Sequence, residues 1–203
     1  MRTHNLATLA LAISTAFSAP VLAQDTETTE KKQSALEQIT VTAQKRTQSI
    51  QEVPISVATL SGEKFESLFS GGEDILALAV RVPGLYAESS NGRVAPRFYI
   101  RGLGNTDFDL AASQPVSIIM DEVVMENVVL KSFPLFDVQQ VEVLRGPQGT
   151  LFGRNTTAGI IKFDTVKPTQ DVEGYAKAGF GSYGTMNFEG AVSGGLTDEL
   201  SAR

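Results

Sequence analysis

Few side chains of this 203-residue chain could carry out acid–base or nucleophilic chemistry. The sequence contains no cysteine, which excludes thiol nucleophiles and disulfides. Its one histidine, His4, is the only residue that could serve a histidine-based triad. Asp107 and Asp109 could act as a general acid and base, but they follow Gly104 in a stretch typical of a solvated loop. A G-x-S-x-G nucleophile motif is also missing. We therefore expect no catalytic residue and no metal site.

A glycine-rich run could instead bind phosphate. Residues Gly149 to Arg154 lack the GK[ST] ending that supplies the lysine and the metal-binding hydroxyl of a phosphate-binding loop. The chain has 17 basic and 23 acidic residues, for a formal net charge of −6. An acidic balance disfavours a nucleic-acid partner. We expect neither a nucleotide site, nor a bound cofactor, nor a nucleic-acid partner.

The first 23 residues have the order of a secretory signal peptide. Arg2 provides the basic start, an apolar stretch runs from Leu6 to Phe17, and small residues lead to Ala23. A helix of this apolar stretch would reach only about 18 Å, well short of a hydrocarbon core of about 30 Å. Export with cleavage after Ala23 is the expectation. Residues 24–38 are polar without an apolar face, which predicts a flexible linker.

Residues 39–43 alternate apolar and β-favouring polar side chains, in the order Ile39-Thr40-Val41-Thr42-Ala43. This alternation predicts an extended strand. The pattern admits two interpretations. The segment is either the first strand of the next domain or a strand on a flexible arm that is offered to the sheet edge of another protein.

Residues 44–168 mix short helical and short strand patterns, which predicts an α+β domain. A helix is expected after Ser61, which would cap it, with Phe65 on the buried face. A second helix is expected to begin at Glu73 and to end at Val82, before a proline and a glycine. Strands are expected at Arg97–Arg101, Val116–Met120, Val123–Asn127, Val141–Leu144 and Ile160–Thr165.

From residue 169 the hydrophobic period becomes two. Apolar and polar residues alternate from Val172 to Phe180 and again from Met186 to Leu196, with a turn at Gly181 to Gly184. Strands of about ten residues with one apolar face are typical of a transmembrane β-barrel. Because two strands cannot stand alone, we expect residues 169–203 to be the first strands of an incomplete antiparallel barrel. A soluble hairpin is the alternative.

One long run resembles the plug motif of TonB-dependent outer-membrane receptors. It reads VEVLRGPQGTLFGRNTTAG and extends from Val141 to Gly159. In the family's order it is preceded by Ile39 to Ala43, which is similar to the TonB box, by VPISV from Val53, by VPGL from Val82 and by YIRG from Tyr99. The resemblance covers essentially the whole chain after the signal segment. It implies a signal peptide (1–23), a linker (24–38), a TonB box (39–43), a plug domain (44–168) and the first barrel strands (169–203).

The resemblance also implies roles for single residues. The TonB box would pair with the TonB protein of the inner membrane through Ile39, Thr40, Val41, Thr42 and Ala43. The family places plug arginines opposite barrel glutamates, and the candidates here are Arg101, Arg145 and Arg154. Glycines of the plug motifs would permit tight turns and close passage along the barrel wall, and these are Gly102, Gly146, Gly149, Gly153 and Gly159.

The function implied is a receptor in the cell outer membrane, in contact with lipid through its barrel. It would bind a scarce small molecule, by default an iron–siderophore complex, and import it when TonB pulls on a box reached from the periplasm. The alternative is a stand-alone periplasmic binding or scaffolding module. One departure from the family is Asp121-Glu122, where Asp-Gly is common. Glutamate resists the positive φ of a type I′ turn, so the geometry of this hairpin stays open.

Overall fold

The computed structural model describes residues 39–42, 44–69, 75–89, 92, 94–107, 109, 111–133 and 135–203. The predictions for residues 1–38 and for Ala43 lie outside these ranges. In chain order the elements are β1 (Thr40–Val41), β2 (Gln48–Ser49), β3 (Ser56–Ser61), α2 (Gly62–Phe69), η1 (Ile75–Ala77), α3 (Leu78–Arg81), β4 (Leu85–Glu88), β5 (Arg97–Ile100), β6 (Leu103–Gly104), β7 (Val116–Met120), β8 (Val123–Met125), η2 (Val128–Lys131), β9 (Val138–Arg145), α4 (Gly149–Phe152), β10 (Gly159–Thr165), β11 (Glu173–Phe180), η3 (Ser182–Gly184), β12 (Met186–Gly195) and β13 (Ser201–Ala202).

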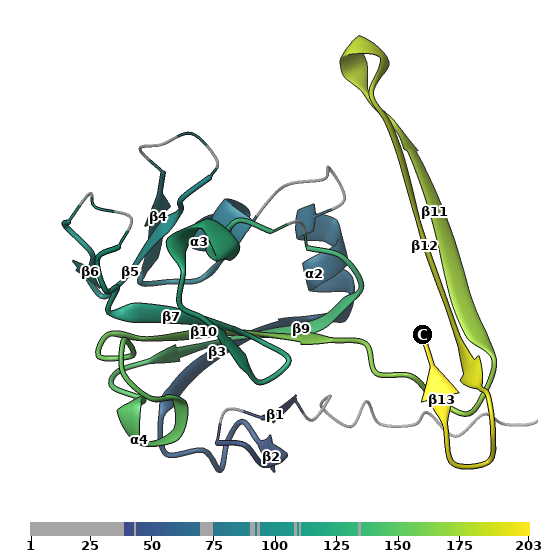
Figure 1. Cartoon of the computed structure of the whole chain (residues 1–203), viewed down its shortest axis with the longest axis horizontal. Coiled ribbons are helices and arrows are strands. Elements are labelled where there is room, and N and C mark those ends of the chain that lie inside the picture. Colours follow the sequence, from purple (N-terminus) through teal and green to yellow (C-terminus); the bar gives the residue numbers. More distant parts are fainter. Residues whose placement is uncertain are drawn as a thin grey trace, which may run out of the picture. The chain divides into compact units, whose positions relative to one another are not determined.

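A five-stranded sheet in the order β3-β9-β10-β7-β8 organises the fold (Figure 1). β10 and β7 run parallel, and the other neighbours in this sheet are antiparallel. β4, β5 and β6 form a separate three-stranded sheet, and β1 and β2 form a short hairpin. The mixture of short helices with mixed and antiparallel strands confirms the predicted α+β class.

The two faces of the central sheet pack against different partners. Along β10, Ile161 and Phe163 point into a core that includes Phe65 of α2, whereas Ile160 points into a second core that includes Val41 of β1. This alternation follows from the two-residue period of a strand. Figure 1 shows α2 and α3 on one side of the sheet and β1, β2 and α4 on the other. The central strands are therefore covered on both faces.

Both expected helical segments form, but they are short. α2 follows Ser61, which is the last residue of β3, and buries Phe65 as expected. The second segment is a 3₁₀ turn, η1, that leads into the four-residue α3, and it buries Ile75 and Leu78. It ends before Val82, as the following proline requires. No helix in the described ranges is long and apolar enough to cross a bilayer.

The turn Asp121-Glu122 closes the β7–β8 hairpin although it lacks glycine. The two residues have φ angles of 45° and 70°, as a type I′ turn demands. The carboxylate of Asp121 accepts hydrogen bonds from the backbone N–H and the hydroxyl of Thr165, at 2.9 and 2.8 Å. Glu122 lies 3.0 Å from the ammonium of Lys162. These contacts offset the left-handed backbone strain, which is about 1–2 kcal/mol per residue.

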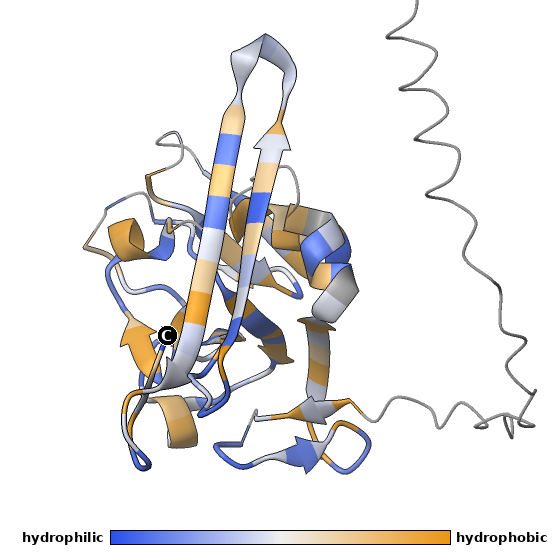
Figure 2. Ribbon diagram, turned by 90° about the vertical axis from the view of Figure 1, so that its right-hand side faces the viewer, coloured by the Kyte–Doolittle hydropathy of each residue, from blue (hydrophilic) through white to orange (hydrophobic). Residues whose placement is uncertain are grey.

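β11 and β12 form the long antiparallel hairpin expected after the plug. The register pairs Phe180 with Met186 and Ala178 with Phe188, so the apolar residues of both strands share one face. Figure 2 shows the alternation of apolar and polar positions along both strands. Phe180 and Phe188 are 80% and 84% exposed, so this face is unpartnered within the part of the chain that the structure describes.

A pair of glycine substitutions separates crowding from backbone strain. Gly159 has a φ of 149°, and a Cβ atom there would overlap the carbonyl oxygen of Leu144. Gly153 has a φ of 80°, and its added Cβ would meet nothing within 4 Å. We expect Gly159→Ala to lower the free energy of unfolding by about 3 kcal/mol or more and Gly153→Ala by about 1 kcal/mol, measured by denaturant titration. Equal losses would show that the close approach at Gly159 has no special role.

Candidate functional site

The N-terminal strand β1 lies against the face of the central sheet that carries the second core. Val41 is fully buried there, next to Leu144 and Ile160. β2 pairs with one edge of β1, and the N–H of Ile50 extends this ladder by donating to the carbonyl of Ile39 at 3.0 Å. Antiparallel pairs alternate, so the peptide groups of residues 39 and 41 face β2 and those of residues 40 and 42 face the opposite edge.

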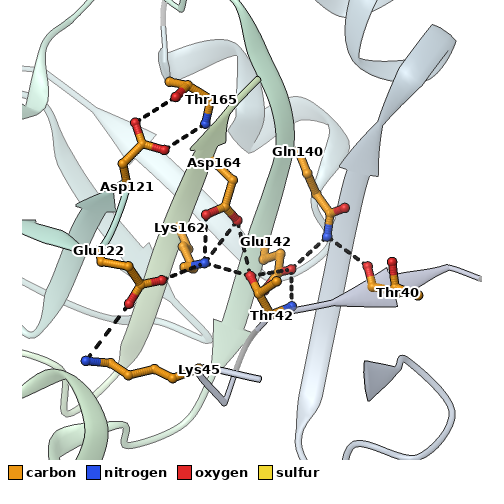
Figure 3. Close-up of polar contacts among 10 residues, drawn as sticks. All are labelled: Thr40, Thr42, Lys45, Asp121, Glu122, Gln140, Glu142, Lys162, Asp164 and Thr165. Carbon is orange, nitrogen blue, oxygen red and sulfur yellow. Dashed lines mark hydrogen bonds and ion pairs between the residues drawn. The ribbon is translucent and has the colours of Figure 1, made fainter. Parts of the chain in front are cut away.

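Side chains from β9 occupy that opposite edge of β1. The amide Nε2 of Gln140 donates to the carbonyl of Thr40 at 3.0 Å, and the N–H of Thr42 donates to Oε1 of Glu142 at 2.6 Å. Gln140 also donates to Glu142 at 2.7 Å, which joins the two contacts (Figure 3). The second edge of β1 is thus satisfied by two side chains and not by a strand.

A buried lysine lies beside these contacts. The side chain of Lys162 is 1% exposed, and its ammonium donates to the hydroxyl of Thr42 at 2.6 Å and to Asp164 at 2.7 Å, with Glu122 at 3.0 Å. Burial alone would lower the pKa of this ammonium, but the hydrogen bonds and charges of Asp164 and Glu122 raise it above its ordinary value. Lys162 therefore stays charged at neutral pH.

Glu142 is fully buried, and burial raises the pKa of its carboxyl. The N–H of Thr42 and the charge of Lys162 oppose this shift. Oε1 also lies 3.2 Å from the hydroxyl of Thr42, whereas Oε2 has no hydrogen-bond partner among the described residues. Among the described residues, two of the three polar contacts of this carboxylate therefore involve Thr42, in the segment that carries β1.

The turn after β1 completes the arrangement. The N–H of Lys45 donates to the carbonyl of Thr42 at 2.8 Å, and its ammonium lies 3.9 Å from Glu122 and 5.3 Å from the ring centre of Phe152. We call the polar residues that hold β1 and its turn the docking network. Its members are Thr40, Thr42, Lys45, Glu122, Gln140, Glu142, Lys162 and Asp164.

Of this network, only Thr40 and Thr42 are among the site residues predicted from the sequence. A signal for the others exists, because Glu142 and Lys162 each stand in the middle of an apolar strand, between residues that fill the first core. In a sheet with one solvent-exposed face, charged residues at such positions would point to water. Where both faces are covered, as here, they must have polar partners inside the fold. The part of the predicted box that the structure describes has strand geometry only at Thr40 and Val41.

The structure brings two of the three predicted plug arginines together. Arg145 ends β9 and donates twice to the carbonyl of Pro83, at 3.2 and 2.9 Å. Arg101 follows β5 with a φ of 53°, and its N–H donates to the carbonyl of Gly84 at 2.8 Å. Burial and then the charge of Arg101 lower the pKa of Arg145. The turn after α3 thus gathers two cations.

Arg154 lies apart from this pair. Its side chain is 80% exposed and forms an ion pair with Glu126 at 3.3 Å. Contact of any of the three arginines with a barrel wall stays a prediction. Of the five predicted glycines, Gly149 begins α4, and positive φ angles occur at Gly102, Gly146, Gly153 and Gly159.

The paired acids that could have served an enzyme shape a loop. The carboxylate of Asp107 accepts from the N–H of Asp109 at 3.0 Å, and that of Asp109 accepts from the N–H of Ala111 at 2.9 Å. Both acids are exposed. Side-chain to backbone bonds of this kind stabilise turns. Within the described ranges no group of three or more metal-ligating side chains is clustered to hold an ion.

Residues 49–160 match the family described as "TonB-dependent Receptor Plug Domain". A pesticin receptor of Yersinia enterocolitica is 34% identical over 122 residues, which cover 59% of this chain and 17% of that protein. An iron-regulated outer membrane virulence protein of Vibrio cholerae is 29% identical over 207 residues, which cover 95% of this chain and 30% of that protein. The ferric yersiniabactin uptake receptor FyuA from Yersinia pestis superposes with a TM-score of 0.64 at 29% identity, over 72% of this chain and 22% of that one.

The chain therefore spans less than a third of the length of each of these relatives. Their names describe receptors or outer-membrane proteins and not enzymes. This agrees with the expectation, drawn from the sequence, that the chain is not an enzyme.

The burial of Glu142 gives the stability of the protein a testable pH dependence. Because the pKa of this carboxyl is raised on folding, its stabilising contribution is complete below its ordinary value of 4.5 and is lost as the pH rises through the raised value. Glu142→Gln removes the titrating group and keeps an oxygen acceptor for Thr42. We expect wild type to lose more thermal stability than Glu142→Gln between about pH 4 and pH 7. Parallel pH profiles of the two melting temperatures would contradict the shift.

Proposed function

The chain belongs to the TonB-dependent receptor plug family, and on this premise we propose that it is the N-terminal part of an outer-membrane receptor that imports a scarce ligand with energy delivered by TonB. The family match covers most of the residues between β2 and β10. The β11–β12 hairpin, with its single apolar face, has the pattern of a barrel strand pair and supports transport over a stand-alone periplasmic module. The plug would lie inside the barrel, with β1 reached from the periplasm.

The observation that carries this proposal is the docked strand β1. It belongs to the segment that resembles a TonB box, which precedes the family match at residues 49–160. Side chains of β9, and not a neighbouring strand, bind the backbone edge of β1 that faces away from β2. A short strand of this kind can add to the sheet edge of a partner, because backbone hydrogen bonds supply the affinity. Apart from the buried Val41, the contacts that hold it on the plug are few and polar, so they can be exchanged. We propose that residues 39–43 bind TonB in this way.

For the cargo we propose an iron–siderophore complex. The Vibrio cholerae relative is named as iron-regulated, and the Yersinia pestis structure is named as a ferric yersiniabactin uptake receptor. Both names support an iron chelate as the ligand class.

The coupling role is tested by proline substitutions in the full-length receptor. Thr40→Pro together with Thr42→Pro deletes the two amide donors on the edge of β1 that faces away from β2, whereas alanine at both positions keeps them. We expect the proline variant to lose energised uptake of radiolabelled ferric siderophores while it still binds the same chelates at the surface of energy-depleted cells. The alanine variant should retain most of its uptake. Normal uptake by the proline variant would show that the segment is not the coupling element.

The paired arginines are tested by plug retention. Two cations at one turn, if they face carboxylates of a barrel wall, would form charge-assisted contacts that hold the plug. We expect Arg101→Gln with Arg145→Gln to raise the entry of a large antibiotic such as vancomycin by severalfold. Arg81→Gln, an exposed arginine in the last turn of α3, serves as the control. Unchanged entry with unchanged stability would show that the pair is only a surface feature.

A further inference from the structure

The two side chains on the open edge of β1 imitate a neighbouring strand. In a β ladder, each backbone C=O on a strand edge accepts from an N–H of the neighbouring strand, and each N–H donates to a C=O of that strand. Here the carbonyl of Thr40 meets the amide of Gln140, and the N–H of Thr42 meets the carboxylate of Glu142. Gln140 and Glu142 stand two residues apart on one face of β9, about 7 Å along the strand, which matches the repeat of a ladder.

From this geometry we propose that Gln140 and Glu142 act as a surrogate strand on the edge of β1 at which TonB adds its own strand, and that TonB binds by replacing them. The inference rests on the coupling role proposed above for residues 39–43. It adds which edge TonB uses and which residues compete with it. TonB would extend the β1–β2 hairpin to three strands, with its hydrogen bonds directed to Thr40 and Thr42.

The two edges of β1 differ in how readily they can be exchanged. On one edge, backbone groups of β2 pair with β1 in register, with Thr40 opposite Ser49 and Val41 opposite Gln48. On the other edge, the bonds come from side chains that belong to the sheet and not to the arm. The hairpin can therefore leave the sheet as a unit and present its second edge without breaking its own ladder.

The residues left behind remain partnered when the hairpin leaves. Lys162 keeps Asp164 and Glu122, which lie on β10 and on the β7–β8 turn. Glu142 keeps its contact with Gln140 and regains water, which relieves the burial that raises its pKa. The principal apolar losses are Val41, which leaves the second core, and the partly buried Ile50, which packs against that core. The contacts that dock the hairpin can therefore be broken without leaving a buried charge unpaired.

The test measures binding of the purified C-terminal domain of TonB to the full-length receptor in detergent, without siderophore. Gln140→Leu with Glu142→Leu removes both surrogate groups, and the apparent affinity should rise about tenfold or more, because a larger fraction of the receptor presents the open edge. Glu142→Gln keeps an acceptor for Thr42 and should change the affinity much less. Glu66→Leu, an exposed carboxylate of α2 on the other side of the sheet, serves as the control.

A further variant decides between the two edges. Gln48→Pro removes a donor from β2 and so frees the edge of β1 that faces it. If TonB uses the edge of Thr40 and Thr42, Gln48→Pro should not tighten binding. Tighter binding by Gln48→Pro, with no change in the leucine variant, would overturn the assignment of the edge.

The remaining outcomes separate the two proposals. Barrel assembly of each variant is checked by heat-modifiable electrophoretic migration, so that a folding failure is recognised. If wild type binds TonB but the assembled leucine variant binds no tighter, the surrogate-strand inference is wrong and the coupling role stands. If neither wild type nor any variant binds TonB, and the Thr40 and Thr42 proline variant imports normally, the coupling role itself is wrong.

Discussion

A lysine ammonium that is removed from water must keep oxygen partners, and much of the plug structure around β1 meets this requirement for Lys162. Its partners come from three segments that are far apart in sequence: Thr42 after β1, Glu122 in the β7–β8 turn and Asp164 on the same strand. Leaving such a charge unpaired would destabilise the fold by several kcal/mol. The strained turn and the docked strand are therefore linked through one cation.

Charges are a weak source of stability for a docked strand, but they specify its position. A one-residue slip of β1 would turn Val41 out of the second core and move the groups of residues 40 and 42 away from β9. An apolar contact alone tolerates such a slip better than hydrogen bonds with fixed donors and acceptors do. The docking network thus sets the register, while the single buried valine supplies the apolar contribution, about 2 kcal/mol for a side chain of this size.

Several strands could be located from the sequence, because their runs of β-branched and apolar residues are typical of strands. β3 and β4 are not among the predicted strands, and β9 begins three residues before the predicted Val141–Leu144. The predicted Val116–Met120 is β7 unchanged, and Ile160–Thr165 differs from β10 by one residue. The position of Glu142 inside an apolar strand indicates burial, but its partner could not be predicted from that pattern, because Thr42 lies one hundred residues earlier. Asp121-Glu122 shows the same limit. Local preference argues against positive φ there, and the contacts that permit it, from Thr165 and Lys162, lie about forty residues later.

The order of strands in the sheet determines which contacts a pulling force on the N-terminal arm would break first. After β1 and β2 the chain continues into β3, which lies at the edge of the central sheet and pairs only with β9 there. A pulling force on the N-terminal arm that breaks the docking network therefore acts next on an edge strand, and only then on the interior strands of the sheet. Six residue pairs join β3 to β9, whereas two side chains cap the open edge of β1. Because β9, β10 and β7 are each paired on both sides, they can stay assembled while the arm is displaced. The most easily exchanged contacts therefore lie at the proposed coupling segment, and the most extensive pairing lies in the central strands β9, β10 and β7, which follow it in the chain.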